Sequence, residues 1–284
     1  MSAHMERKTA LVPKVLDTFL FTHEFDLLEL RLRTLWPVVD KFLLMEGDHN
    51  FANKPKPMRF DEQRARFDWA KDKLTILHHV GPFKDYVIPL PGQVPPYGGG
   101  ELFVEHQHRQ CLYDNAKVMP GFLPDDIMLI SDVDELPSRE VIERLKAEDF
   151  TSPTLLKQDF YYYNIKCHRG MRWDGSIATR FGHDVGDIGR MRGKRNKMVS
   201  IDSNCGWHLA HFFDAEGIRE KLQHSSHQHY NSETYYAPEH LKTCVQENKS
   251  YLGKADGNLP PEPLPAYLIN EMKRFPIMMG EEWR

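Results

Sequence analysis

Residues 15–48 read VLDTFLFTHEFDLLELRLRTLWPVVDKFLLMEGD and contain three segments with different hydrophobic patterns. Val15 to Phe21 is a short apolar run, which is typical of a buried strand. In Glu24 to Trp36 the apolar residues recur at helical spacing, and Pro37 lies just past the end of that segment. Lys41 to Met45 is a second apolar run. This β-α-β opening predicts an α/β fold with a mostly parallel, Rossmann-like central sheet and flanking helices.

The chain continues the alternation as far as a strand that ends in acidic residues. Asp61 to Lys73 is predicted to be a helix and Leu74 to Val80 a strand. Gly81 to Gly100 is dense in Pro and Gly and predicts a long loop. A helix over Glu101 to Val118 then precedes the strand Ile127 to Ile130.

Patterns after the acidic residues are weaker. The predicted elements are a helix restarting at Pro137, an aromatic strand over Thr154 to Ile165, loops over the basic stretch Arg169 to Lys197, a strand over Leu209 to Phe213 and a helix over Ala215 to Gln223.

The composition is that of an ordinary globular protein, with 284 residues, 40% of them hydrophobic and 27% charged. No flexible linker divides the chain. We expect an N-terminal tail (1–14), one domain (15–250) and a Pro-rich C-terminal extension packed on that domain (251–284). The four cysteines lack metal-site spacing, which favours reduced thiols.

Net charge and hydropathy limit the classes of partner. The formal net charge of -4 gives no general attraction to nucleic acid, so we expect no nucleic-acid partner. No stretch of about 18 apolar residues occurs, which predicts no transmembrane segment. We expect a soluble, cytoplasmic protein; a catalytic domain cut from an anchored, Golgi-type enzyme is the alternative.

Three carboxylates fall within four residues in Ser131-Asp132-Val133-Asp134-Glu135, directly after the aliphatic strand. In an extended segment Asp132 and Asp134 would project to the same side. That arrangement suits Mn²⁺ or Mg²⁺ held by carboxylate oxygens, with a diphosphate completing the coordination shell. The structural alternative is an acidic turn that caps the helix after Pro137.

Several separated blocks of this sequence resemble glycosyltransferase family 17. Residues 17–21 and 24–32 look like the opening of the family, and residues 46–51 with 54–57 look like its next block. Residues 131–137 are similar to its acidic motif, and residues 206–208, 216–218 and 221–222 to its C-terminal block. The order and spacing of these blocks are much more specific than the D-x-D pattern alone. Met171 to Ser203 has no clear match.

The resemblance implies a GT-A type fold, and a metal-dependent, inverting transfer of a sugar from a UDP-sugar to a hydroxyl of a glycan acceptor. The sugar expected from the resemblance is GlcNAc. Asp132 and Asp134 would contact metal and donor, and Glu135 would add a further contact or orient them. His208 is a candidate additional ligand of the metal or the diphosphate, with a buried core histidine as the alternative.

Further donor-binding candidates are spread along the chain. Glu46, at the end of a predicted strand, could accept hydrogen bonds from uracil or ribose, or be a solvated carboxylate. Arg109 and Lys221 could reach a phosphate or sugar, although such residues usually lie on the solvated face of a helix. The resemblance favours His227 as a residue that lines the site.

Two groups of charged residues allow more than one interpretation. The first is a basic run that comprises Arg190, Arg192, Lys194, Arg195 and Lys197. It could be a mobile lid over the diphosphate, a binding surface for an anionic acceptor, or a solvated surface segment. The general base is not chosen by the sequence from among Asp159, Asp174, Asp184, Asp187 and Asp214.

Two other classes of function remain open at this point. A metal-dependent nucleotide-sugar phosphohydrolase could use the same acids and a histidine to activate water. A non-catalytic carbohydrate-binding protein could stack sugars on Trp173, Trp207 and the run from Tyr161 to Tyr163, although aromatic residues on strands usually belong to the core.

Overall fold

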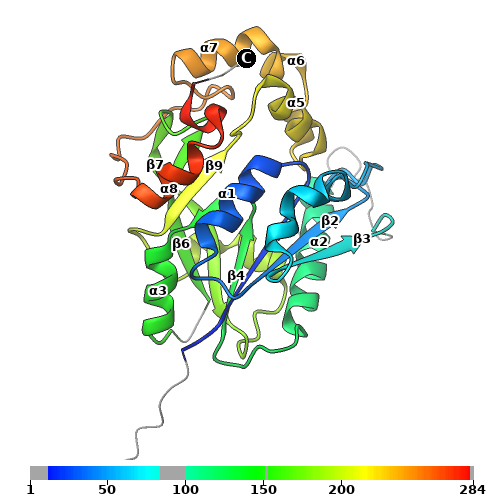
Figure 1. Cartoon of the computed structure of the whole chain (residues 1–284). Helices are drawn as coiled ribbons and strands as arrows, with labels where there is room; N and C mark the ends of the chain where they lie inside the picture. Colours follow the sequence, from blue (N-terminus) through cyan, green and yellow to red (C-terminus); the bar gives the residue numbers. More distant parts are fainter. Residues whose placement is uncertain (1–11, 84–99, 151–152, 282–284) are drawn as a thin grey trace, which may run out of the picture.

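The computed structural model describes residues 12–83, 100–150 and 153–281 (Figure 1). Its centre is a nine-stranded sheet, in which the order β3-β2-β1-β4-β7-β6-β9-β5 forms the main path and β8 pairs with β6. The strands are β1 (Val15–Leu20), β2 (Lys41–Gly47), β3 (Leu74–His79), β4 (Ile127–Asp132), β5 (Glu135–Pro137), β6 (Thr154–Tyr162), β7 (His168–Arg180), β8 (Ser200–Ile201) and β9 (Gly206–Ala210).

The first four strands are parallel, as the β-α-β opening predicts. The chain runs outward from β1 through β2 to β3, then returns to place β4 on the other side of β1. Strand order therefore reverses between β1 and β4, and Leu20 at the end of β1 pairs with Asp132 at the end of β4. Open α/β sheets bind ligands at such a switch point, outside the carboxyl ends of the strands.

Helices cover both faces of the sheet because the strands alternate their side chains between two apolar cores. Val15 and Phe19 pack against α1, α3 and α8, whereas Leu16 and Leu20 pack against α2 and α4. The helices are α1 (Phe25–Leu35), α2 (Gly100–Lys117), α3 (Arg139–Ala147), α4 (Ile188–Gly193), α5 (Ala215–His224), α6 (Glu233–Tyr236), α7 (Pro238–Gln246) and α8 (Ala266–Met272), with the 3-10 helices η1 (Phe60–Ala70), η2 (Arg195–Lys197), η3 (Gln228–Tyr230) and η4 (Pro276–Met279).

The predicted α/β class is confirmed: β1 to β4 form a parallel, Rossmann-like half-sheet, and the remaining strands form a mixed half. β7 runs antiparallel to both β4 and β6, and β9 is parallel to β6. A third apolar cluster joins β6 and β9 to α5 and α7, which lie at the top of Figure 1 above the carboxyl ends of β1 and β4.

Three predictions from the sequence need correction. The basic stretch Arg169 to Lys197 is not all loop, because it contains the long strand β7 and helix α4. β7 is poor in apolar residues, but hydrogen bonds to strands on both sides stabilise it. The helix predicted over Asp61 to Lys73 is the 3-10 helix η1, with a kink at Gln63. The strand predicted over Leu209 to Phe213 begins earlier, at Gly206, and ends at Ala210.

Two other segments bear on the predictions. Most of the predicted loop from Gly81 to Gly100, and most of the N-terminal tail, lie outside the described residues. In the C-terminal extension, α8 inserts Leu268 and Met272 into the core beside α1 and α3. Across the described ranges, no helix has the length and apolar character needed to cross a bilayer.

Candidate donor site at the acidic turn

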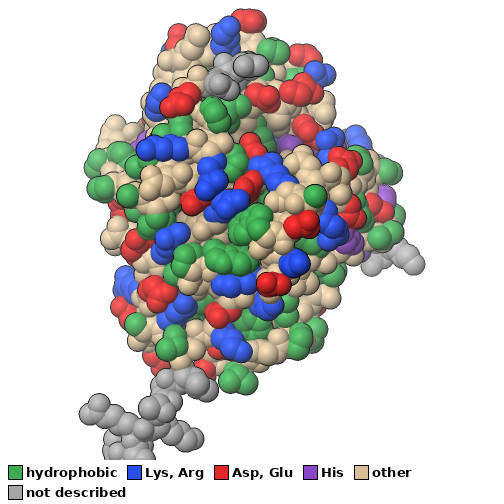
Figure 2. All heavy atoms as spheres, in the orientation of Figure 1, with side chains coloured by type: hydrophobic (Ala, Val, Ile, Leu, Met, Phe, Trp, Pro, Cys, Tyr) green, Lys and Arg blue, Asp and Glu red, His purple; other side chains and the backbone are tan. Residues whose placement is uncertain are grey.

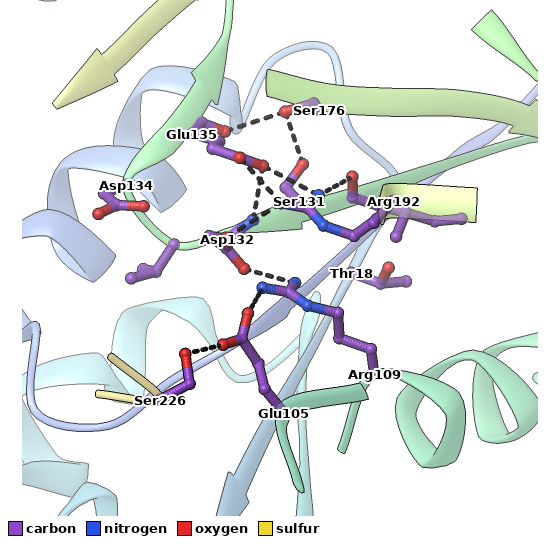
Figure 3. Close-up of polar contacts among 12 residues, drawn as sticks. Thr18, Glu105, Arg109, Ser131, Asp132, Asp134, Glu135, Ser176, Arg192 and Ser226 are labelled. Atoms are coloured by element: carbon purple, nitrogen blue, oxygen red, sulfur yellow. Dashed lines mark hydrogen bonds and ion pairs between the residues drawn. The ribbon is translucent and has the colours of Figure 1, made fainter. Parts of the chain in front are cut away.

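The acidic residues form a tight turn between β4 and β5 instead of continuing the strand. β4 ends at Asp132, Val133 and Asp134 form the turn, and β5 begins at Glu135. The expectation that Asp132 and Asp134 project to the same side is therefore wrong. Figure 3 shows the two carboxylates pointing away from one another.

Asp132 lies between two arginines that come from different helices. Its Oδ1 is 2.5 Å from Nη1 of Arg109 in α2, and its Oδ2 accepts a hydrogen bond at 3.0 Å from Nη2 of Arg192 in α4 (Figure 3). Burial opposes ionisation, but the two guanidinium groups outweigh it and hold the pKa of Asp132 well below its usual range. Asp132 is therefore a carboxylate anchored by two cations.

Asp134 faces a different set of partners, on α5 and β9. Lys221 donates a hydrogen bond from Nζ to its Oδ2 at 2.6 Å, and Nδ1 of His208 lies 3.7 Å from its Oδ1. Burial opposes the charge of Lys221, but Asp134 and Glu24 outweigh burial and raise the lysine pKa. Lys221 is thus part of the site and not on a solvated helix face.

Glu135 is the buried base of the turn, with no exposed surface. Its Oε2 accepts the backbone N–H of Asp132 at 3.0 Å and Nη1 of Arg192 at 3.1 Å. Its Oε1 accepts Nη2 of Arg192 at 2.9 Å and the indole N–H of Trp173 at 3.0 Å. Both oxygens are therefore occupied by protein donors, and Glu135 orients Asp132 instead of facing a ligand.

His208 is held in a rigid aromatic setting. Its ring stacks on Trp173 at 4.6 Å between centroids and on Phe160 at 5.1 Å. β9, which carries His208, pairs with β5, and this pairing requires a glycine at position 206. The φ of Gly206 is +113°, and a Cβ there would clash with the backbone of Leu136. Burial lowers the pKa of His208, which keeps the imidazole neutral at neutral pH.

The pair Asp134 and His208 fits a divalent cation. Nδ1 of His208 is buried and has no hydrogen-bond partner among the described residues, and it lies beside a carboxylate oxygen. Within those residues, no three His, Cys, Asp or Glu side chains come together as ligands. Mg²⁺ is commonly bound by one or two carboxylates plus substrate phosphates and water, so a carboxylate such as Asp134 can hold it without a larger set of protein ligands. Asp132 is not gathered with them, because its oxygens face Arg109 and Arg192.

Two predicted donor-binding residues lie elsewhere. Glu46 is fully buried, and its oxygens accept the backbone N–H groups of Arg59 at 2.6 Å and Phe60 at 3.1 Å, at the start of η1. It is neither solvated nor free to contact a nucleotide, because the helix N-terminus uses both oxygens. His227 is exposed, and its ring contacts those of His229 and Tyr230.

Three residues that contact the acidic turn or its arginines were given no individual role by the sequence: Arg192, Arg195 and Glu105. Arg192 and Arg195 come from the basic run, and both contact Glu135. Glu105 accepts hydrogen bonds from Arg109 at 2.6 Å and from the Ser226 hydroxyl at 2.7 Å, which links α2 to the chain after α5. The spacing of Glu105 and Arg109, four residues apart in a predicted helix, was an available signal.

The aromatic residues proposed for sugar stacking are mostly core. Trp207 is 4% exposed and belongs to the cluster beneath the sheet, and the run from Tyr161 to Tyr163 is buried as well. Trp173 is half-buried between His208 and the guanidinium of Arg195. Neither arrangement offers a broad aromatic platform.

Four of the five candidate bases have structural partners. Asp187 and Asp214 cap α4 and α5 by accepting backbone N–H groups. Asp159 is fully buried beside Arg172 at 3.0 Å, and Asp184 accepts the N–H of Gly186 at 2.9 Å. Asp174 is half-buried on β7, one residue after Trp173.

The surface carries no dominant charge on the face that holds α1 and α3. Figure 2 shows Lys and Arg side chains interspersed with Asp and Glu over this face. A surface hollow of about 590 Å³ lies along α4 and is lined by Asp187, Arg190, Met191 and Lys194 among others. None of the predicted metal or donor ligands lines that hollow, so its size does not identify the functional site.

Glu24 provides a pH-dependent test of this cluster. Burial opposes its ionisation, but Lys221, His23 and backbone N–H groups outweigh burial and lower the pKa of Glu24 from 4.5 to about 2. Because its pKa is lowered, the ionised Glu24 carboxylate contributes about 3 kcal/mol to the free energy of unfolding above pH 4.5. This contribution is lost as the pH falls from 4.5 towards 2. Urea unfolding across this range should show a smaller pH-dependent loss for Glu24→Gln; parallel pH profiles would contradict the assignment.

Comparison with known proteins places this site in a family. The sequence model of the family described as Glycosyltransferase family 17 matches residues 2–252 of this chain. β-1,4-Mannosyl-glycoprotein 4-β-N-acetylglucosaminyltransferases from Rattus norvegicus and Homo sapiens are each 27% identical over 181 residues, which is 60% of this chain but 30% and 31% of theirs. The matched segment thus spans under a third of those relatives.

A solved structure, mannosyltransferase PcManGT from Pyrobaculum calidifontis in complex with GDP-Man and Mn²⁺, shows weak similarity. Its TM-score is 0.39 with 11% identity, covering 84% of this chain and 72% of that chain. The family match, in contrast, covers most of the sequence and includes β1, α1, the acidic turn and β9. The chain belongs to glycosyltransferase family 17.

Proposed function

We propose that this protein transfers a sugar from a nucleotide-sugar donor to a hydroxyl group of a glycan acceptor, with residues 15–250 as the catalytic domain. The observation that carries the proposal is the position of the acidic turn. Asp132 ends β4 where strand order reverses beside β1, which is where an α/β sheet binds nucleotides. Membership in glycosyltransferase family 17 supports the same reaction class.

The proposed donor is a UDP-sugar, with UDP-GlcNAc as the first choice and inversion at the anomeric carbon. The names of the relatives, which are N-acetylglucosaminyltransferases, support this choice. A cytoplasmic location stays a prediction from the sequence.

The proposed cofactor is Mn²⁺ or Mg²⁺, held by Asp134 and His208. When bound, such a cation supplies positive charge beside the leaving diphosphate. Lys221 holds Asp134 in place through a hydrogen bond at 2.6 Å. Arg109 and Arg192 hold Asp132 and place two positive charges beside the end of β4, where positive charge favours a diphosphate.

The chemistry requires charge stabilisation and an aligned acceptor. Oriented cations in a buried site stabilise negative charge more strongly than the same groups in water. Arg109, Arg192 and Lys221 are buried or half-buried and come from three different helices. They are therefore placed before the donor arrives, and little reorganisation is needed when the diphosphate departs.

A donor screen tests the proposal directly. UDP or GDP release would be followed with UDP-GlcNAc, UDP-Gal, UDP-Glc and GDP-mannose, each with Mn²⁺ and with a chelator. We expect UDP release from a UDP-sugar, faster with a glycan acceptor and lost with chelator. Release of phosphate or monophosphate without acceptor would indicate the phosphohydrolase alternative. Sugar binding without turnover, unchanged by chelator, would indicate a carbohydrate-binding protein.

A further inference from the structure

A buried arginine beneath the acidic turn has no role in the contacts described so far. Arg31 lies in the middle of α1, has no exposed surface, and is the largest fully buried side chain of the described residues. Its Nε and Nη2 donate to the two carboxylate oxygens of Asp17 on β1, at 2.7 and 2.6 Å. This is a bidentate ion pair inside the apolar core under β1.

The remaining nitrogen of Arg31 reaches the backbone of the turn. Its Nη1 lies 2.6 Å from the carbonyl oxygen of Glu135, 3.1 Å from that of Asp132 and 3.4 Å from that of Val133. Three carbonyls of four consecutive residues therefore converge on one guanidinium nitrogen. An extended strand alternates its carbonyls and cannot direct them to one point, so this contact requires the turn.

Stability alone is a poor explanation for such a group. A buried ion pair gains little over apolar residues of the same volume, because removing two charges from water offsets their attraction. α1 is otherwise lined with leucines on this face, and a leucine or methionine at position 31 would suit the core. What an apolar residue cannot supply is a set of donors for the turn carbonyls.

We propose that Arg31 is a positioning residue, which fixes the backbone of the acidic turn so that Asp132 keeps its contacts with the arginines and Asp134 faces His208 at the proposed donor site. The proposal rests on the proposed function of the site. With the carbonyls held inward, Asp132 is directed to Arg109 and Asp134 to Lys221. Asp17 in turn holds the guanidinium plane in the required orientation.

Two variants test this inference against a merely structural role. Arg31→Lys keeps the charge beside Asp17, but a single ammonium cannot serve both that carboxylate and three carbonyls. The double variant Asp17→Val with Arg31→Met removes the buried pair completely, which avoids an unpaired charge if the lysine variant folds poorly. Arg33→Lys is the matched control, because Arg33 is partly exposed on the same helix and pairs with Glu29.

The readouts are the UDP dissociation constant with Mn²⁺, kcat and KM, and hydrogen exchange of the backbone amides of residues 131–136. We expect Arg31→Lys to lower kcat about 100-fold, because a displacement of about 1 Å in a reacting group has that effect, with a smaller change in acceptor KM. The amide of Asp132 should exchange faster in both variants, while Arg33→Lys behaves as wild type.

Folded variants with wild-type kcat, UDP affinity and amide exchange would overturn the role of Arg31. Failure of the proposed function looks different, since wild-type protein itself would then neither bind UDP nor turn over a UDP-sugar, and both proposals would fall together.

Discussion

Replacing Asp134 by asparagine is expected to lower donor-dependent turnover by about 10³-fold, the size of effect seen when a preorganised electrostatic contact is removed from an active site. Asparagine has nearly the same shape and still accepts the hydrogen bond from Lys221, which lies 2.6 Å from the carboxylate. It lacks the negative charge needed beside His208 for a divalent cation. UDP release and calorimetric titration with Mn²⁺ would measure the two losses.

A matched control separates charge at this position from charge in general. Asp26→Asn removes a carboxylate from α1 whose partner, Arg66, lies on η1, away from the turn. The Asp26 side chain is 49% exposed, so turnover should stay within twofold of wild type. An Asp134→Asn protein with an undiminished rate and undiminished Mn²⁺ affinity would remove the basis for the proposed metal site.

The Glu135→Ala substitution should have the largest effect on stability of any single change in the site. Glu135 is fully buried and satisfies Arg192, the Trp173 indole and the N–H of Asp132. Removing it leaves those donors inside the protein without their acceptor, at a cost of about 3–5 kcal/mol. Since domains are stable by only about 5–15 kcal/mol, much of the protein's stability would be lost.

Urea or thermal unfolding measures this effect, and an exposed pair provides the comparison. Glu148→Ala breaks the ion pair of Arg144 and Glu148 on α3, where both side chains are about half exposed. Such pairs contribute less than about 1 kcal/mol, so this variant should unfold close to wild type. Equal unfolding free energies for Glu135→Ala and Glu148→Ala would show that the buried network does not stabilise the turn.

Local sequence patterns were sufficient for the first half of the fold. The apolar runs of β1 and β2, the helical spacing of α1 and the strand before Asp132 depend on neighbouring residues, and all of them form as predicted. β7 was missed because its stability comes from pairing with β4 and β6, which are distant in sequence. Half of its length is polar and gives no local strand pattern.

The candidate site also has a part that local sequence predicts and a part that depends on tertiary contacts. The sequence by itself determined that carboxylates follow β4, because a strand and the residues after it are a local pattern, and it drew attention to His208 and Lys221. Only the tertiary structure decided that Asp132 and Asp134 diverge, that Glu46 caps η1, and that Arg31 and Arg192 reach the turn. These contacts join residues 13 to 104 positions apart, and no local pattern encodes which distant side chain a buried charge will meet.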